Sequence, residues 1–215
     1  MRVNTRVRAL EFLVQEKGLP GVRETVPAFR SLLVYYDPLA VAYEALCEAL
    51  AELGDQLEHV SLPPSRVVEL PCCYQDAELG IDLVAAAERL GLPPAELARL
   101  HAGAEYLVYF IGFTPGLPYM DVPARIVLPR LETPRTKVPV GSVGIGGIQC
   151  CIYSVESPGG YWILGRTPLR LYDPEATEPI LLRPGDRVRF RAIDRGEYDG
   201  IAAAVAARTF TPVIA

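Results

Sequence analysis

The sequence predicts an α+β protein in which a helix-bearing N-terminal part is followed by an all-β unit. Residues 106–173 hold nine of the chain's 18 glycines and eight of its 20 prolines. This density indicates many tight turns between short extended runs. No helical period of ten residues occurs there, whereas helical patterns occur before it. We therefore expect a domain boundary near residue 77, with an α+β domain at 1–76 and linker helices plus a β unit at 77–215.

The first domain is expected to open with a helix. Residues 5–17 return apolar side chains to one face at helical spacing, and Gly18 follows as a helix-ending residue. Residues 2–8 also alternate as a short strand would, which is the less favoured alternative. Two extended runs come next, at 22–27 and 31–36, the second rich in residues that favour strands. The domain therefore begins as a helix followed by two strands.

A second helix and a further strand are expected to complete this domain. Residues 39–53 place Leu39, Leu46 and Leu53 on one inward face, and residues 66–74 read as a strand. The order helix, strand, strand, helix, strand is typical of helices packed on one face of an antiparallel sheet. This order matches a ferredoxin-like unit that lacks its first strand.

Two short helices are expected to lead into the β unit. They cover residues 81–90 and 94–102, the second opening on proline as helices often do. Short strands with turn signals then follow one another from residue 105 to Phe190, which favours a closed barrel. Residues 201–207 fit either a short helix or a buried strand.

Composition argues against several classes of protein. The net charge of −5, the sequence pI of 5.2 and the lack of a Lys/Arg run disfavour a nucleic-acid partner. No apolar run approaches the roughly 18 residues that span a bilayer. The N-terminus has no apolar signal core, so a cytoplasmic protein is expected. No cluster of metal ligands is evident in the sequence.

The five cysteines are expected to be reduced thiols. Four of them form the adjacent pairs Cys72–Cys73 and Cys150–Cys151, and neighbours in a strand point to opposite faces. Neither pair can therefore chelate a metal in the usual way. Small buried side chains are the favoured interpretation, with a nucleophile at Cys150 or Cys151 as the alternative.

The β unit carries a locally basic rim on glycine-rich loops. Such a rim suits a carboxylate, carbonyl or phosphate group, although solvated turn charges are the favoured interpretation for any single arginine. The glycines of 112–116 and 141–147 can present backbone N–H groups to an oxyanion, or can simply serve turn geometry. Neither segment has the pattern of a nucleotide phosphate loop. The basic residues are Arg125, Arg130, Arg135, Lys137, Arg166 and Arg170.

Four phrases in and after this region form a long, ordered set: GFTPGLPYM (112–120), LPRLETPRTKVPVGSVGIGGIQ (128–149), SPGGYWILGRTPLRLYD (157–173) and RPGDRVRF (183–190). They resemble the KipI family, also called allophanate hydrolase subunit 1 or the B subunit of 5-oxoprolinase. A weaker echo, VPAFRSLLVYYDP (26–38), extends the resemblance over almost the whole chain. The family also resembles part of the carboxyltransferase domain of urea carboxylase.

The resemblance implies both a fold and an activity. The fold would be a ferredoxin-like domain followed by a cyclophilin-like β-barrel. The activity would be ATP-dependent opening of the pyroglutamate lactam to glutamate, in a complex with a carboxyltransferase-like C subunit plus an A subunit of 5-oxoprolinase. The chain would be inactive alone, and ATP would be required by the assembled complex. The alternatives are an inhibitor of a sensor histidine kinase and a carboxyltransferase component of urea or allophanate metabolism.

The resemblance also implies a set of site residues. Arginines would hold a carboxylate, Gln149 would orient an amide or lactam, and Thr114 or Tyr119 would donate hydrogen bonds. His101, at the end of a helix, would act as a proton carrier, although a favourable interaction with the helix dipole explains it as well. The substrate-binding residues implied are Thr114, Tyr119, Arg130, Arg135, Gln149, Tyr153, Arg166 and Thr167.

The chain also departs from the family's usual pattern. Leu117 stands where phenylalanine is usual, Tyr161 where tryptophan is usual, and Cys150–Cys151 where Thr-Gly is usual. All three differences are expected to line one site, so the ligand can differ from that of other members. The family's usual first strand has no counterpart in this sequence, because the start is assigned late or the unit is built differently.

Overall fold

The computed structural model describes residues 3–215 and divides into two compact units, the first ending at Pro64 and the second covering Ser65–Ala215. This division precedes strand β3 (Val67–Cys73), whereas the sequence placed the boundary after that strand. The expected domains 1–76 and 77–215 are corrected accordingly. The reason is pairing, because among the described residues β3 bonds only to strands of the second unit. A strand's sequence indicates how its faces are buried, not which strand lies beside it.

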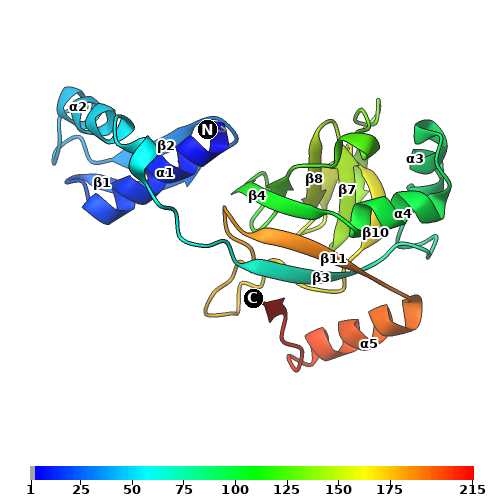
Figure 1. Ribbon diagram of the computed structural model, residues 1–215. Helices are drawn as coiled ribbons and strands as arrows, with labels where there is room; N and C mark the ends of the chain where they lie inside the picture. The colour runs from blue at the N-terminus through cyan, green and yellow to red at the C-terminus, as the bar shows by residue number, and fades with distance from the viewer. Residues whose placement is uncertain (1–2) are drawn as a thin grey trace. The chain divides into compact units, whose positions relative to one another are not determined.

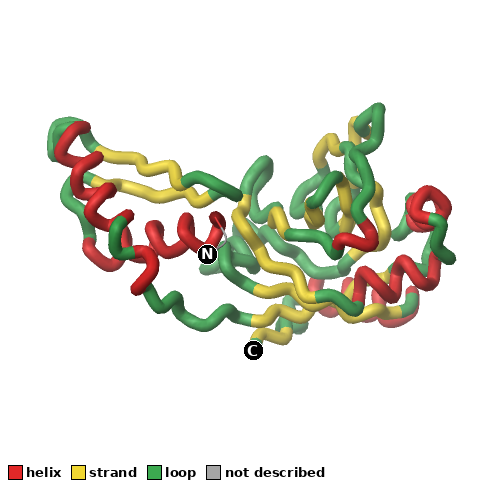
Figure 2. Tube along the Cα trace, turned by 45° about the horizontal axis from the view of Figure 1, so that its top comes forward, coloured by secondary structure: helices red, strands yellow, loops and turns green. Residues whose placement is uncertain are grey.

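The first unit consists of two helices and a hairpin. Helix α1 (Val3–Lys17) is followed by β1 (Val22–Pro27), β2 (Leu32–Tyr36) and α2 (Tyr43–Gly54), with a short 3₁₀ turn η1 (Leu57–His59). The hairpin runs alongside the helices (Figure 2). The helix at residues 5–17 is confirmed. Its apolar face buries Ala9, Leu13 and Val14 against Leu53 and Leu57.

Two expectations for this unit need correction. Helix α2 begins at Tyr43 rather than at residue 39, and Leu39 is 97% exposed rather than inward. Asp37 is the cause, because its carboxylate accepts the backbone N–H of Leu39 and its carbonyl accepts those of Ala40 and Val41. These bonds form a turn before the helix. The ferredoxin-like arrangement is not confirmed, since the described sheet here contains β1 and β2 alone.

Seven strands of the second unit close into a barrel (Figure 1). Around the ring the order is β10, β7, β8, β5, β4, β11 and β3, and the pairing of Arg166 with Cys73 joins β10 back to β3. Strands β3 and β11 are parallel, and the other neighbours in the ring are antiparallel. The expected closed barrel is therefore confirmed. Besides β3, its strands are β4 (Glu105–Ile111), β5 (Pro118–Met120), β7 (Ser142–Gly146), β8 (Gln149–Ile152), β10 (Trp162–Arg166) and β11 (Arg187–Ile193).

The remaining elements surround the barrel. Helices α3 (Leu83–Leu90) and α4 (Pro94–Ala102) match the two expected linker helices, and Gly91 ends α3 in the left-handed conformation. Of residues 201–207, for which the sequence fitted either a helix or a strand, 201–206 are helical and belong to α5 (Arg195–Ala206). The other short elements are η2 (Ala124–Ile126), β6 (Arg135–Val138) paired with β9 (Ser157–Gly159), and β12 (Val213–Ile214), which pairs with β3.

One wall of the barrel buries apolar side chains on both of its faces. Alternate residues of a strand point to opposite faces. In β8, Cys150 joins the interior core while Cys151 joins a second, outer cluster with Tyr153 and Ile163. The opposite orientation expected for the two thiols is therefore observed. The outer cluster also contains Tyr161, which places aromatic side chains where the candidate site is found.

No helix within residues 3–215 combines the length and the apolar character that crossing a membrane requires.

Candidate functional site

A small pocket of about 100 Å³ lies on the outer cluster of the barrel wall. Its walls come from the loop after β4, from β5, β8 and β9 with the residues that follow β8 and β9, and from the segment between η2 and β6 that carries Arg130. The pocket therefore joins the first three phrases of the glycine-rich region in one place. The lining residues are Phe113, Leu117, Tyr119, Arg130, Cys151, Tyr153, Pro158, Gly159, Gly160 and Tyr161.

Arg130 is the cation of this pocket, and its neighbours are neutral. Its Nη2 donates to the Tyr161 hydroxyl at 3.0 Å and to Gln149 Oε1 at 3.2 Å. The Tyr161 hydroxyl in turn donates to the same Gln149 oxygen at 2.6 Å. The guanidinium carbon lies 4.8 Å from the centroid of the Tyr161 ring. These contacts hold the guanidinium in place. Arginine carries five N–H donors, so some of them remain available to a ligand.

No carboxylate forms an ion pair with Arg130 anywhere in residues 3–215. Around the guanidinium, burial raises the pKa of Tyr119, Tyr153 and Tyr161. Burial also raises the pKa of the Cys151 thiol. These groups therefore stay protonated at neutral pH and can donate hydrogen bonds. One positive charge beside neutral donors suits a carboxylate or a carbonyl oxygen.

Glycines make room for the aromatic rings of the pocket. A Cβ atom at Gly159 would overlap the Tyr153 hydroxyl, and one at Gly146 would lie 2.5 Å from a ring carbon of Tyr161. Neither position is compatible with a side chain. These two glycines therefore leave room for the rings of Tyr153 and Tyr161 beside the pocket.

The structure brings together four of the nine residues expected at the site. Tyr119, Arg130 and Tyr153 line the pocket, and Gln149 is hydrogen bonded to Arg130. Thr114 follows the lining residue Phe113, and its hydroxyl lies 3.4 Å from that of Ser154. Phe113 also lines the pocket but was not among the residues expected at the site. Its place inside the GFTPG phrase was the available signal.

Arg135 is engaged elsewhere. Its Nη2 lies 2.5 Å from a carboxylate oxygen of Asp82, whose other oxygen accepts the backbone N–H of Ile163 at 2.7 Å. Its Nη1 also donates to the Tyr161 carbonyl at 3.4 Å. Arg135 therefore connects β6 to the start of α3 and to the segment that enters β10, and its charge is already balanced by Asp82.

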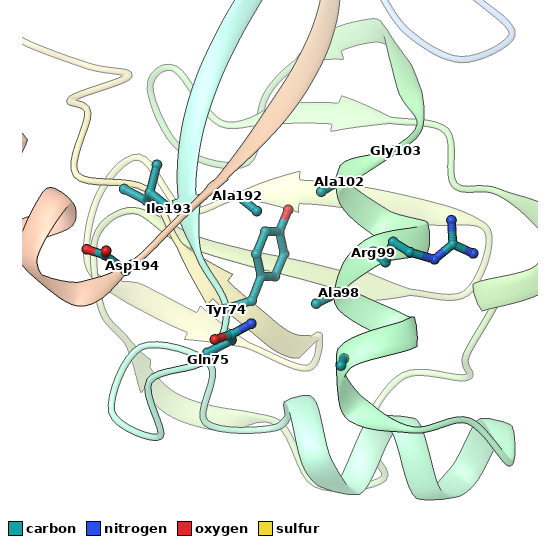
Figure 3. A pocket seen from close by; sticks show the side chains of 10 residues that line it. Tyr74, Gln75, Ala98, Arg99, Ala102, Gly103, Ala192, Ile193 and Asp194 are labelled. Carbon is teal, nitrogen blue, oxygen red and sulfur yellow. The ribbon is translucent and has the colours of Figure 1, made fainter.

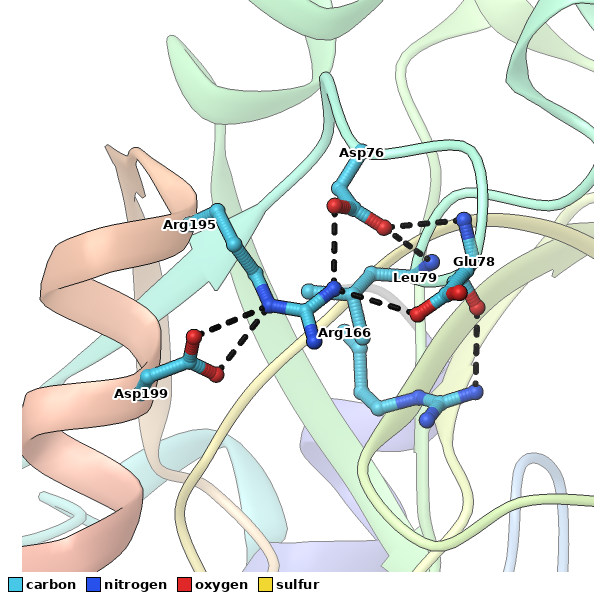
Figure 4. A network of polar contacts seen from close by, with 6 residues as sticks. All are labelled: Asp76, Glu78, Leu79, Arg166, Arg195 and Asp199. Carbon is cyan, nitrogen blue, oxygen red and sulfur yellow. Dashed lines mark hydrogen bonds and ion pairs between the residues drawn. The ribbon is translucent and has the colours of Figure 1, made fainter.

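Arg166 and Thr167 also lie outside the residues that line the pocket. Figure 4 shows Arg166 beside the loop after β3, where its Nη2 is 3.5 Å from the Glu78 carbonyl. Arg195 holds the same loop through Asp76 and Glu78. Thr167 is buried, and its hydroxyl accepts the backbone N–H of Leu169 at 3.3 Å. Both residues support the barrel's structure at these positions.

His101 lies in the barrel core with none of its surface exposed. Its Nδ1 is 2.8 Å from the Tyr74 hydroxyl, and its Nε2 is 3.6 Å from the Cys150 thiol. A cleft of about 590 Å³ opens above Tyr74, between α4 and the end of β11 (Figure 3). Tyr74 lines this cleft and contacts His101, but His101 is not among the residues that line it. This position is that of a core residue, and the catalytic role stays a prediction.

Burial of His101 predicts a dependence of stability on pH. Burial lowers the pKa of His101 to about 3 from an ordinary value of 6.5. Below pH 6.5 the unfolded chain binds a proton at His101 that the folded chain excludes. The contribution of neutral His101 to the free energy of unfolding is therefore fully present above pH 6.5 and is lost as the pH falls from 6.5 to about 3. The loss approaches about 1.4 kcal/mol per pH unit.

The measurement is urea unfolding between pH 7.5 and 5 for the chain and for His101→Gln. We expect the unmodified chain to lose free energy of unfolding more steeply with acid than the variant. Equal slopes would show that His101 does not remain neutral in the folded protein.

Three differences from the family's usual residues were expected to line one site. Leu117, Tyr161 and Cys151 do line one pocket. Cys150 is the exception, because it faces the interior core. Burial raises the pKa of both thiols, so neither is a thiolate at neutral pH. Within residues 3–215, no group of three His, Cys, Asp or Glu side chains is placed to hold a metal ion.

Comparison with known proteins gives consistent results along the chain. A family model described as carboxyltransferase domain, subdomain C and D, matches residues 1–182. The B subunit of the Bacillus subtilis 5-oxoprolinase is 38% identical over 92% of this chain and 86% of its own length. The B subunit of the Escherichia coli O157:H7 5-oxoprolinase is 42% identical over 80% of this chain and 78% of its own length.

A solved structure shares the fold as well. The crystal structure of TTHA0988 superposes with a TM-score of 0.80 at 38% identity and covers 90% of this chain. The present chain spans only 38% of the length of that protein. A segment similar to this chain therefore occurs there as one part of a longer polypeptide.

Proposed function

This chain belongs to the family of the carboxyltransferase domain, subdomains C and D, and we propose that it is the B subunit of a 5-oxoprolinase. Its substrate would be 5-oxoproline, a small lactam with one carboxylate, which water opens to glutamate. The names of the two bacterial relatives support this proposal. The observation that carries it is the pocket, where Arg130 meets neutral hydrogen-bond donors and no carboxylate of the described chain.

Each end of the substrate has a suitable partner in this pocket. Arg130 binds the carboxylate, because its remaining donors match the geometry of two carboxylate oxygens. The phenol groups of Tyr119 and Tyr153 line the same pocket and can donate to the lactam carbonyl oxygen. A carbonyl that accepts hydrogen bonds is more easily attacked, because charge that develops on its oxygen is stabilised. Opening the ring breaks the C–N bond, and water supplies the hydroxyl and the proton.

The chain does not contain every group that this reaction needs. The pocket has no carboxylate or accessible histidine within residues 3–215 to act as a general base. The glycine-rich loops connect strands rather than leading into a helix, so they do not form a cradle for the phosphates of ATP. We therefore propose that ATP and the missing acid–base groups belong to two partners, the carboxyltransferase-like C subunit plus the A subunit, and that this chain alone is inactive.

The test is reconstitution. The chain would be purified alone and then combined with these two partner subunits from its own host, and glutamate released from 5-oxoproline would be measured with ATP. We expect release from the mixture and none from the chain alone. An assembled complex that binds ATP yet releases no glutamate would contradict the proposal.

A further inference from the structure

The hydroxyl of Tyr161 joins two side chains of the candidate site, Arg130 and Gln149. It accepts a hydrogen bond from Arg130 Nη2 at 3.0 Å and donates one to Gln149 Oε1 at 2.6 Å. The same Nη2 also donates to Oε1, at 3.2 Å. The three polar atoms thus form a closed triangle, and the Tyr161 hydroxyl takes part in two of its three bonds.

Arg130 sets the direction of every bond in this triangle. A guanidinium carries donors alone, so the Gln149 atom that it reaches is the amide oxygen, and the Tyr161 hydroxyl must accept from it. The hydroxyl then has one proton left, which it donates to Oε1. With its oxygen turned to these two donors, the amide turns Nε2 away from them. Within residues 3–215 this nitrogen has no hydrogen-bond partner, so its two N–H donors remain available to a ligand.

The phenol ring of Tyr161 is closely packed. A Cβ atom at Gly146 would lie 2.5 Å from one of its ring carbons. On the ring also lies the Arg130 guanidinium, whose carbon is 4.8 Å from the centroid, as in a cation–π contact. Tyr161 is 4% exposed, and burial raises the pKa of its phenol. The hydroxyl therefore keeps its proton at neutral pH and can always donate it to Gln149.

The backbone holds the arginine and the tyrosine together as well. Leu131 N donates to the Gly160 carbonyl at 2.8 Å, and Trp162 Nε1 donates to the Pro129 carbonyl at 2.7 Å. The two bonds involve the residues directly before and after the arginine and the tyrosine in sequence. The geometry of this pair is therefore set by the protein itself, before any ligand binds.

We propose that Tyr161 is a positioning residue that fixes the direction of the Arg130–Gln149 network, so that both side chains present N–H donors to the substrate. This inference rests on the proposed function. The carboxylate and the lactam carbonyl of 5-oxoproline offer oxygen acceptors, which such donors match. Without the Tyr161 hydroxyl, the Gln149 oxygen keeps one of its two bonds and the amide can rotate. A rotated amide would turn its own oxygen toward the substrate oxygens, which repel it.

The first measurement is steady-state hydrolysis of 5-oxoproline by the assembled enzyme with Tyr161→Phe, which removes the hydroxyl and keeps the ring. We expect KM to rise about tenfold and kcat to change less than about threefold, because the positioned donors hold the substrate before and during the reaction. The matched control is Tyr35→Phe, since Tyr35 lies on β2, is 51% exposed and does not line the pocket. It should leave both constants unchanged.

Two readouts separate positioning from a purely structural role. In a Gln149→Ala background, Tyr161→Phe should raise KM by less than about threefold, because the group that it positions is gone. In the isolated chain, NMR relaxation should show that the side-chain amide of Gln149 is more mobile in Tyr161→Phe than in the unmodified protein. A purely structural tyrosine would have the same effect on KM with and without Gln149.

The proposal is overturned if KM of Tyr161→Phe stays within about twofold of the unmodified enzyme, or if the amide of Gln149 stays as rigid in the variant. The NMR measurement needs no turnover, so the two proposals can fail separately. An unmodified complex that releases no glutamate, with a Gln149 amide that loosens in the variant, removes the enzymatic function and leaves the positioning of Gln149. An active complex that Tyr161→Phe does not impair removes the positioning role alone.

Discussion

Arg130→Ala is expected to lower kcat/KM for 5-oxoproline in the assembled enzyme by at least about 100-fold, with the chain still folded. The reason is that Arg130 is the cation of the pocket and keeps donors free beyond its bonds to Gln149 and Tyr161. A charge-assisted pair with a carboxylate contributes roughly 3 kcal/mol when one partner is lost from a water-poor site, which corresponds to this factor. Steady-state kinetics on the complex measure it.

A substrate without the carboxylate provides the control. Hydrolysis of 2-pyrrolidinone, the same lactam without its carboxylate, should be slow in the unmodified complex and little changed by Arg130→Ala. Arg166→Ala should stay within a few-fold of the unmodified enzyme, because Arg166 lies beside Glu78 rather than in the pocket. An equal loss for both lactams would show that Arg130 does not bind the carboxylate.

Removing the guanidinium of Arg135 is expected to destabilise the second unit by about 3 kcal/mol, because it leaves a buried carboxylate without its cation. The Asp82 side chain is only 9% exposed, while that of Arg135 is 31% exposed. Partial screening at the arginine keeps the expected effect at the lower end of the range for broken buried pairs. Urea unfolding of Arg135→Ala measures the change.

The same strand offers a matched comparison. Lys137 forms an ion pair with Glu156 at 3.0 Å, but the two side chains are 76% and 54% exposed. Lys137→Ala should therefore cost less than about 1 kcal/mol. If the two substitutions destabilise the chain equally, the Asp82–Arg135 pair does not have the structural role assigned to it.

Local features of the fold were predictable from the sequence, because they depend on residues close together in the chain. Gly91 ends one helix and Pro94 opens the next, as their backbone preferences require. Cys150 and Cys151 face opposite sides of the barrel wall because they are neighbours in a strand. The density of glycine and proline likewise indicated the short strands that form the barrel.

Features that depend on distant partners were not predictable in the same way. Strand β3 was assigned to the wrong unit because its own residues do not specify β11 and β10 as neighbours. Arg135 looked available for substrate because Asp82, its partner, is 53 residues earlier in the chain. His101 looked like a surface group at a helix end, yet Tyr74, Tyr106 and Phe190 enclose it.

The candidate site falls between these two cases. The glycine-rich phrases pointed to the region in which the pocket lies, and Arg130, Gln149 and Tyr153 do meet there. The sequence could not show that the bridge between Leu128 and Gly147 brings Arg130 to Gln149. The sequence also could not show that the two arginines differ. Arg135 forms an ion pair with Asp82, whereas Arg130 has no carboxylate partner in the described chain.

The most direct test of the central claim is a crystal structure of the assembled enzyme with 5-oxoproline bound. The account predicts that the substrate carboxylate lies within hydrogen-bond distance of the Arg130 guanidinium, with the lactam carbonyl facing the phenol groups of the same pocket. Substrate in the cleft above Tyr74, or held entirely by the partner subunits, would contradict it.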